Sequence, residues 1–542
     1  MTNIALLPDI YPTVSAPGSV LIFLGTRASR PQPNGKQEGA GRPRSQGCKP
    51  GYRPGPCAPE AATATRVIQF YFLAFWIDQA APGLSDLENS RKIDWRVAAF
   101  CVVILTVFHG AGNAAVQIPP CAIRNFVLSN GLRVLIVEEH DAPVVGVQVW
   151  YHVGSKDEPP GKTGFAHLFE HLMFDGTKNL GPERFSDYIV RSGGVDNAYT
   201  TEDTTVFWET VPSNNLPVVL WLEADRMRNL QINDQTFKTE REVVKEERRL
   251  RFDNQPYGSV VETLYRAAFT VHSYRHQTIG SMDDLEHASV EDIQHFYDTY
   301  YQPSNATLVI VGDLQTSEAE TLAHRYFEPL PSGGAPLDRK IPAEPMQTAR
   351  RVIKLDLDVA LPALVEGYHM PADGTPDAYP LRLAAKILSE GESSRIYQRL
   401  VYEKQIALDA QSTGNFTEDP NLFFVLAILT QGRTPAEGER EMDAEIERLK
   451  NEPVPAQELD KAKNQILREF IVSRETVKTR GDELGYDSVV LKDADLVNTE
   501  WTRFLAVTPE DVQRVAKKYF VPENVTIVEV FPQSNQPSKS GK

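Results

Sequence analysis

Cysteine is scarce in this chain, which has four cysteines among 542 residues. Cys48, Cys57 and Cys101 lie towards the N-terminus, and Cys121 is the only cysteine that follows them. A single thiol cannot form a disulfide within the later part of the chain, nor can it supply a cysteine-rich metal site. The later part of the chain is therefore expected to lack both kinds of stabilising site.

An excess of positive charge is also missing. The chain holds 56 lysines and arginines against 73 aspartates and glutamates, which gives a formal net charge of −17. This balance argues against a nucleic-acid partner, because binding nucleic acid requires basic surfaces. The charged fraction of 24% is ordinary for a globular protein, and the length suffices for two or three domains.

The apolar run over residues 97–108 is too short for a membrane-spanning helix, which needs about 20 residues. Arg91, Lys92 and Arg96 precede this run, and Gly112-Asn113-Ala114 offers a small-residue cleavage site after it. The pattern predicts a signal peptide over residues 91–114, export to the periplasm or secretion, and no stable membrane span in the mature chain. A buried helix or a retained anchor is the alternative.

Residues 1–90 are unusual, because a signal peptide normally stands at the start of a chain. Residues 27–59 are rich in proline, glycine and arginine, and no sustained periodicity is visible around them. We predict that residues 1–90 are disordered or are a mis-assigned extension, with translation starting shortly before Arg91.

Histidine is also rare, at eleven residues, but two histidines stand four positions apart in His167-Leu168-Phe169-Glu170-His171. On an α-helix, positions i and i+4 project from the same face, so both imidazoles can reach one metal ion. A pair of helical histidines is more often a surface or core feature. Here the mostly apolar surroundings favour a metal, because buried histidines need partners. Two nitrogen ligands beside a carboxylate suit hydrolytic zinc, and the order is the His-x-x-Glu-His of inverzincins.

A catalytic zinc site usually has three protein ligands and one open position. Residues 234–251 predict a long charged helix that carries four candidates for the third ligand: Glu240, Glu242, Glu246 and Glu247. Glu240 and Glu247 are two helical turns apart and share nearly the same stripe. Helix geometry alone does not separate Glu246 from Glu247, and most charges on this helix are expected to form solvated ion pairs.

The His-x-x-Glu-His motif, followed by Glu240-x6-Glu247, resembles the pitrilysin/insulinase family of zinc peptidases. The likeness is greatest to the small-chain branch, which includes mitochondrial processing peptidases and bacterial homologues. Two further stretches agree with it: Asn197-Ala198-Tyr199-Thr200, similar to the family's substrate-binding edge strand, and residues 272–280, similar to the loop after its metal-binding helices. The resemblance covers about residues 123–532.

The resemblance implies a zinc-dependent endopeptidase with one zinc ion per chain, bound by His167, His171 and Glu247. Glu170 would be the general base that takes a proton from the zinc-bound water. Glu240 would orient a histidine ligand. Asn197 and Ala198 would hold an unfolded peptide substrate by strand addition. Manganese or cobalt could replace zinc, because metal supply also decides occupancy.

The chain departs from the family in its second half. Active members carry an arginine and a tyrosine that bind substrate and stabilise the oxyanion, in a stretch that corresponds to residues 400–409 here. Tyr402 and Asp409 occupy those two positions. An aspartate would repel a developing oxyanion. We therefore expect a heterodimer with a zinc-free homologous subunit that supplies the missing pair. Alternatively the chain works alone, with Tyr397 or Arg395 substituting, or is weakly active.

The two halves of the chain end in matching blocks, which indicates an internal duplication. Each block has a helix, then proline, asparagine and threonine at matching spacings, then a strand: residues 289–300 with Pro303, Asn305 and Thr307, and residues 508–519 with Pro522, Asn524 and Thr526. We expect an α+β fold of two homologous halves, each a mainly antiparallel sheet with packed helices, closing around a chamber.

The expected boundaries are 115–330 for the zinc-binding half, 331–348 for a linker rich in proline and glycine, 349–533 for the inactive half and 534–542 for a disordered tail. Two other classes of function remain open. One is a non-catalytic scaffold subunit, and the other is a module that captures peptides without cutting them.

Overall fold

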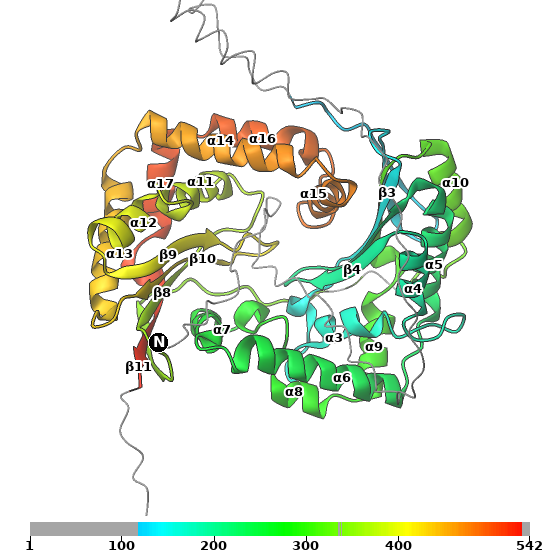
Figure 1. Cartoon of the computed structure of the whole chain (residues 1–542), viewed down its shortest axis with the longest axis horizontal. Helices are drawn as coiled ribbons and strands as arrows, with labels where there is room; N and C mark the ends of the chain where they lie inside the picture. The colour runs from blue at the N-terminus through cyan, green and yellow to red at the C-terminus, as the bar shows by residue number, and fades with distance from the viewer. Residues whose placement is uncertain (1–117, 334–336, 338, 534–542) are drawn as a thin grey trace, which may run out of the picture. The chain divides into compact units, whose positions relative to one another are not determined.

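A computed structural model describes residues 118–333, 337 and 339–533 (Figure 1). The expected extension over 1–90, the signal peptide over 91–114 and the tail over 534–542 lie outside the described residues. In the described part of the chain, no helix is both long and apolar enough to cross a membrane. Cys121 is the only cysteine in that part, and its thiol is free.

The first half is built on a six-stranded sheet in the order β1-β2-β6-β3-β5-β4, in which only the β2–β6 pair is parallel. Its elements in chain order are β1 (Ile123–Val127), β2 (Arg133–Glu138), β3 (Val144–Tyr151), α3 (Phe165–Leu172), α4 (Arg184–Arg191), β4 (Val195–Thr200), β5 (Thr205–Pro212), α5 (Leu216–Asn229), α6 (Asp234–Arg248), α7 (Gly258–Ala268), α8 (Met282–His287), α9 (Val290–Tyr300), β6 (Ala306–Gly312) and α10 (Thr316–Phe327).

The second half is built on a five-stranded sheet in the order β7-β11-β8-β10-β9, in which only the β7–β11 pair is parallel. Its elements are β7 (Arg351–Leu357), β8 (Ala363–His369), α11 (Ala378–Ser389), α12 (Arg395–Tyr397), β9 (Ala407–Gly414), β10 (Leu422–Leu429), α13 (Pro435–Asn451), α14 (Ala456–Val472), α15 (Val477–Val489), α16 (Leu496–Ala506), α17 (Pro509–Tyr519) and β11 (Val525–Pro532).

The two sheets repeat one topology, since β2-β6-β3-β5-β4 corresponds strand for strand to β7-β11-β8-β10-β9. The closing blocks match in their contacts as well. Asn305 donates to the carbonyls of His152 and Tyr300 at 3.1 and 2.9 Å, and Asn524 donates to those of His369 and Tyr519, both at 2.8 Å. The predicted α+β fold with two similar halves is confirmed. The chamber and the domain boundaries stay predictions.

One helix of each half packs against the sheet of the other half. Buried side chains of α7, among them Leu264, pack against β8, β10 and β11 of the second sheet. Buried side chains of α15, among them Leu484, pack against β2, β3, β5 and β6 of the first sheet. Figure 1 shows α15 beside the strands of the first half. Both halves therefore share apolar cores, which makes their folding interdependent.

The matching asparagines give a test of the duplication. Replacing Asn305 or Asn524 by alanine removes two side-chain hydrogen bonds to main-chain carbonyls, so we expect each variant to lose about 1–3 kcal/mol of unfolding free energy. Ser304→Ala is the control, because Ser304 is exposed on the turn next to Asn305. Denaturant unfolding measures all three. Equal stability of Asn524→Ala and Ser304→Ala would contradict the equivalence of the two turns.

Candidate metal centre

Helix α3 carries the His-x-x-Glu-His motif and is held at its start by a buried carboxylate. Gly164 adopts a left-handed conformation with φ of 93° before the first helical residue. Glu158 accepts the main-chain N–H groups of Gly164 and Ala166, both at 2.8 Å. One face of the helix is buried in the first core through Phe165, Leu168, Phe169 and Leu172. The motif's polar side chains leave from the remaining face, as the sequence predicted.

Helix α6 supplies the facing carboxylates. Asn233 caps its start by accepting the N–H groups of Gln235 and Thr236. The α-helix ends at Arg248, and the chain continues as a short π-helix over Arg249–Asp253, so the helical segment expected over residues 234–251 changes type near its end. Helices α3 and α6 pack directly against each other. This contact brings residues about eighty positions apart into one site.

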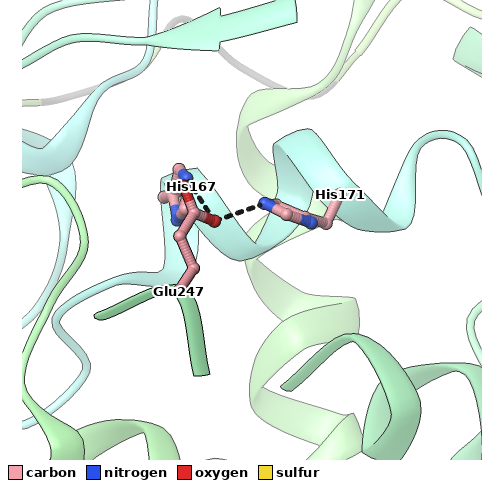
Figure 2. A group of neighbouring side chains, drawn as sticks. All are labelled: His167, His171 and Glu247. Atoms are coloured by element: carbon pink, nitrogen blue, oxygen red, sulfur yellow. Dashed lines mark ion pairs between the residues drawn. The ribbon is translucent and has the colours of Figure 1, made fainter. Parts of the chain in front are cut away.

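Three potential ligands converge between these helices (Figure 2). The Oε2 atom of Glu247 lies 3.3 Å from Nε2 of His171 and 3.8 Å from Nε2 of His167. All three ligand atoms lie within 4.8 Å of one another, and they form the one such group among the described residues. Tetrahedral zinc with bonds of about 2.0–2.2 Å separates its ligand atoms by roughly 3.3–3.6 Å. The three residues therefore fit zinc once their ligand atoms move slightly closer together.

The structure separates the two candidates that the sequence left open. The side chain of Glu246 is 57% exposed and pairs with Arg249 at 3.0 Å. The side chain of Glu247 is 14% exposed and points to the histidines. Glu242 is also exposed and pairs with Lys245 at 3.1 Å. Of the four glutamates, only Glu247 therefore joins both histidines.

Two further residues hold the candidate ligands in place. The carboxylate of Glu240 lies 3.4 Å from Nδ1 of His171, which directs the opposite ring nitrogen towards Glu247. Nη1 of Arg251 lies 2.7 Å from Oε1 of Glu247 and occupies the oxygen that faces away from the histidines. His167 differs, since its buried Nδ1 makes no hydrogen bond to any described residue. The sequence pointed to Glu240, but nothing in it signalled Arg251.

The local charges favour an ionised carboxylate. Burial acts to raise the pKa of Glu247, but His171, His167 and Arg251 hold it at about 2. Burial lowers the pKa of His167, which favours the neutral ring. Burial also acts to lower the pKa of His171, but hydrogen bonds to Glu240 and Glu247 raise it to about 9. His171 must therefore release a proton before its nitrogen can bind a metal.

Glu170 lies between the two histidines in sequence but is held by a different element. Its Oε2 atom accepts a hydrogen bond of 2.7 Å from the hydroxyl of Thr200, the last residue of β4. Among the described residues, this is the only hydrogen bond to the Glu170 carboxylate. The sequence placed Thr200 on an edge strand, but its contact with Glu170, thirty positions away, carries no signal in the sequence.

Strand β4 lies at the end of its sheet and pairs only with β5, so it is the edge strand that the sequence predicted. The N–H of Thr201 donates to the carbonyl of Thr204 across the turn into β5. Because main-chain groups alternate in direction along a strand, those of Ala198 and Thr200 face the open edge. The N–H of Ala198 contacts the side-chain oxygen of Asn197 at 2.9 Å. Ala198 thus presents main-chain groups, and Asn197 presents a side chain beside them.

The two replaced positions of the second half have local partners. The hydroxyl of Tyr402 donates to Glu392 at 3.0 Å, and half of this side chain is exposed. Asp409 lies on strand β9 and accepts a hydrogen bond of 3.2 Å from Gln411. Arg395, considered above as a substitute, is buried in a pair with Glu458 at 2.7 Å. These partners of Tyr402, Asp409 and Arg395 all lie in the second half of the chain, away from the two histidines in sequence.

The neighbouring glutamates provide a matched test of the centre. Glu247→Gln removes a charged ligand, so we expect zinc affinity to fall by at least about 100-fold. Glu246→Gln removes a charge of the same sign one residue away and should leave the affinity unchanged. Zinc titration against a competing chelator measures both. Equal affinities for the two variants would rule out Glu247 as a ligand.

Two family models and several named relatives match this chain. The family model described as Insulinase (Peptidase family M16) matches residues 133–281, and the Peptidase M16 inactive domain matches residues 287–466. Zinc protease PqqE of Helicobacter pylori is 33% identical over 446 residues, which cover 81% of this chain and 98% of that protein. An uncharacterized zinc protease of Bacillus subtilis, YmxG, is 22% identical over 77% of this chain and all of that protein.

Solved structures show the same fold. The crystal structure of a protease from Helicobacter pylori has a TM-score of 0.73 at 33% identity, and the match covers 76% of this chain and all of that one. The periplasmic protease PqqL from Escherichia coli has a TM-score of 0.64 at 18% identity, with 77% of this chain and 48% of that chain covered. The chain therefore belongs to the insulinase family, peptidase family M16.

Proposed function

We propose that the protein is a zinc-dependent endopeptidase that hydrolyses unfolded peptides. The observation that carries the proposal is the convergence of His167, His171 and Glu247, with Glu170 on the same helix and an open edge strand beside it. Relatives that are named zinc proteases support it. One zinc ion per chain is part of the proposal.

The site residues have separate roles in this proposal. Zinc held by His167, His171 and Glu247 would supply a Lewis acid that polarises the scissile carbonyl and lowers the pKa of a water molecule. Glu170 takes the proton of the attacking water and passes it to the leaving amine. Glu240 keeps the His171 ring turned so that Nε2 faces the ligand group.

The edge strand supplies the binding mode. An extended peptide that adds to β4 can pair with the main-chain groups of Ala198 at the open edge, and the Asn197 amide lies beside them. Main-chain pairing of this kind is largely indifferent to peptide sequence. It does require an extended segment, so the substrates are unfolded peptides rather than folded domains.

We also propose a heterodimer with a homologous subunit that carries the missing arginine and tyrosine. Tyr402 and Asp409 are engaged locally, and the aspartate has the wrong charge for an oxyanion. The chain matches only 48% of Escherichia coli PqqL, which leaves that longer protein room for a second unit of similar size. A separate partner chain would serve as such a second unit here.

A periplasmic or secreted location completes the proposal. It rests on the signal-like residues 91–114, and the PqqL structures, which are titled as those of a periplasmic protease, support it. A non-catalytic scaffold or peptide-binding subunit is the second candidate function. The replacements at Tyr402 and Asp409 favour it, and the intact ligand group with Glu170 argues against it.

Hydrolysis of a quenched fluorescent peptide tests the proposal. Glu170→Gln keeps the size of the side chain but removes the base, so we expect kcat to fall by about 10²–10⁴-fold while the zinc content stays at one per chain. Removal of zinc by a chelator should abolish turnover, and added zinc should restore it.

Two other outcomes are informative. Turnover that survives both Glu170→Gln and chelation would contradict the proposed chemistry. Zinc bound without turnover, followed by turnover on adding a homologue with the arginine and tyrosine pair, would support the heterodimer. If peptide binds to the zinc-loaded protein but is never cut with any such partner, the peptide-binding function is favoured.

A further inference from the structure

One polar contact links the edge strand to the motif helix. The hydroxyl of Thr200 donates to Oε2 of Glu170 at 2.7 Å. We propose that Thr200 is a positioning residue that holds the Glu170 carboxylate in register with strand β4. The proposal rests on the function proposed above and assigns a role to a residue that lies outside the ligand group.

The Glu170 side chain depends on this contact. A glutamate has three rotatable side-chain bonds, and Thr200 provides the only hydrogen bond to its carboxylate among the described residues. A hydrogen bond to an ionised carboxylate is stronger than one between neutral groups. With Oε2 held by the hydroxyl, Oε1 is the oxygen left to exchange the proton of the attacking water.

The hydroxyl is itself well anchored. Thr200 pairs with Thr205 in the β4–β5 ladder, and its β-branched side chain restricts rotation about χ1. The next residues form a tight turn in which Oγ1 of Thr201 accepts the N–H groups of Asp203 and Thr204. Buried Asp203 is fixed in turn by the hydroxyl of Tyr274 at 2.6 Å. Thr200 therefore presents a rigid donor to Glu170.

The position of Thr200 gives the contact a consequence for catalysis. Thr200 lies two residues after Ala198 on the strand whose open edge would hold the peptide. Strand β4 then sets both the position of the scissile bond along the strand and the position of the Glu170 carboxylate, whatever side chains the peptide carries. Loss of the hydroxyl should misplace the base and lower kcat, but leave peptide binding intact, because the main chain of β4 is unchanged.

Three substitutions test this role in the full-length protein. Thr200→Val has nearly the same shape but no hydroxyl, and we expect kcat to fall by about 10- to 100-fold with KM changed by less than about twofold. Thr200→Ser keeps a hydroxyl and should recover most of that loss. Thr210→Val is the matched control, because Thr210 lies at the other end of the β4–β5 pair, opposite Val195. Zinc content should be equal in all three.

A second measurement does not depend on turnover. Crystal structures of the zinc-loaded wild type and Thr200→Val should both show His167, His171 and Glu247 in place. We expect one Glu170 conformer bonded to Thr200 in the wild type, and a shifted or multiple Glu170 conformer in the variant.

The outcomes separate the two proposals. A Glu170 side chain that keeps one unchanged conformer in Thr200→Val would overturn the positioning role, as would a rise in KM with unchanged kcat. If the wild-type protein cuts no peptide, with or without a partner subunit, the proposed function is contradicted. In that case the crystal structures still decide whether Thr200 positions Glu170.

Discussion

The placement of one carboxylate between two imidazoles determines the rest of the site. Glu247 reaches His171 and His167 only because α6 packs against α3, and a charge at this depth requires compensation. Arg251 supplies part of it through the second oxygen, and Glu240 orients His171 from a position two turns earlier on α6. The apolar face of α3, the buried cap at Glu158 and the capped start of α6 all serve to keep these two helices in that contact.

The duplicated fold shows that the candidate ligand group depends on side chains rather than on topology. Helix α11 follows β8 in the second half as α3 follows β3 in the first, yet its sequence AYPLRLAAKILS contains neither histidine nor glutamate. The second half repeats the strand order and even the Asn305 turn, but it has lost or never had the ligand group. One contribution of the second half is structural, since α15 completes the core of the first sheet. Fold similarity alone would not have distinguished the two halves.

Much of this was predictable from sequence because it depends on local spacing. The i, i+4 spacing of His167 and His171 holds on any α-helix, and the match between the Asn305 and Asn524 blocks requires only counting. The choice between Glu246 and Glu247 was not predictable from the residues alone, because it depends on how α6 is rotated about its axis against α3. The roles of Thr200 and Arg251 were not predictable from sequence for a related reason. Their partners are fixed by packing and by the π-helical turn after Arg248, which carry no distinct sequence signal.

Anomalous diffraction recorded on both sides of the zinc absorption edge tests the central claim most directly. The account predicts one zinc peak per chain, at about 2.0–2.2 Å from Nε2 of His167, Nε2 of His171 and an oxygen of Glu247. Glu246 should remain in solvent, and Glu170 should remain off the metal. No peak at this position in zinc-supplemented crystals, or a peak bound by other residues, would contradict the account.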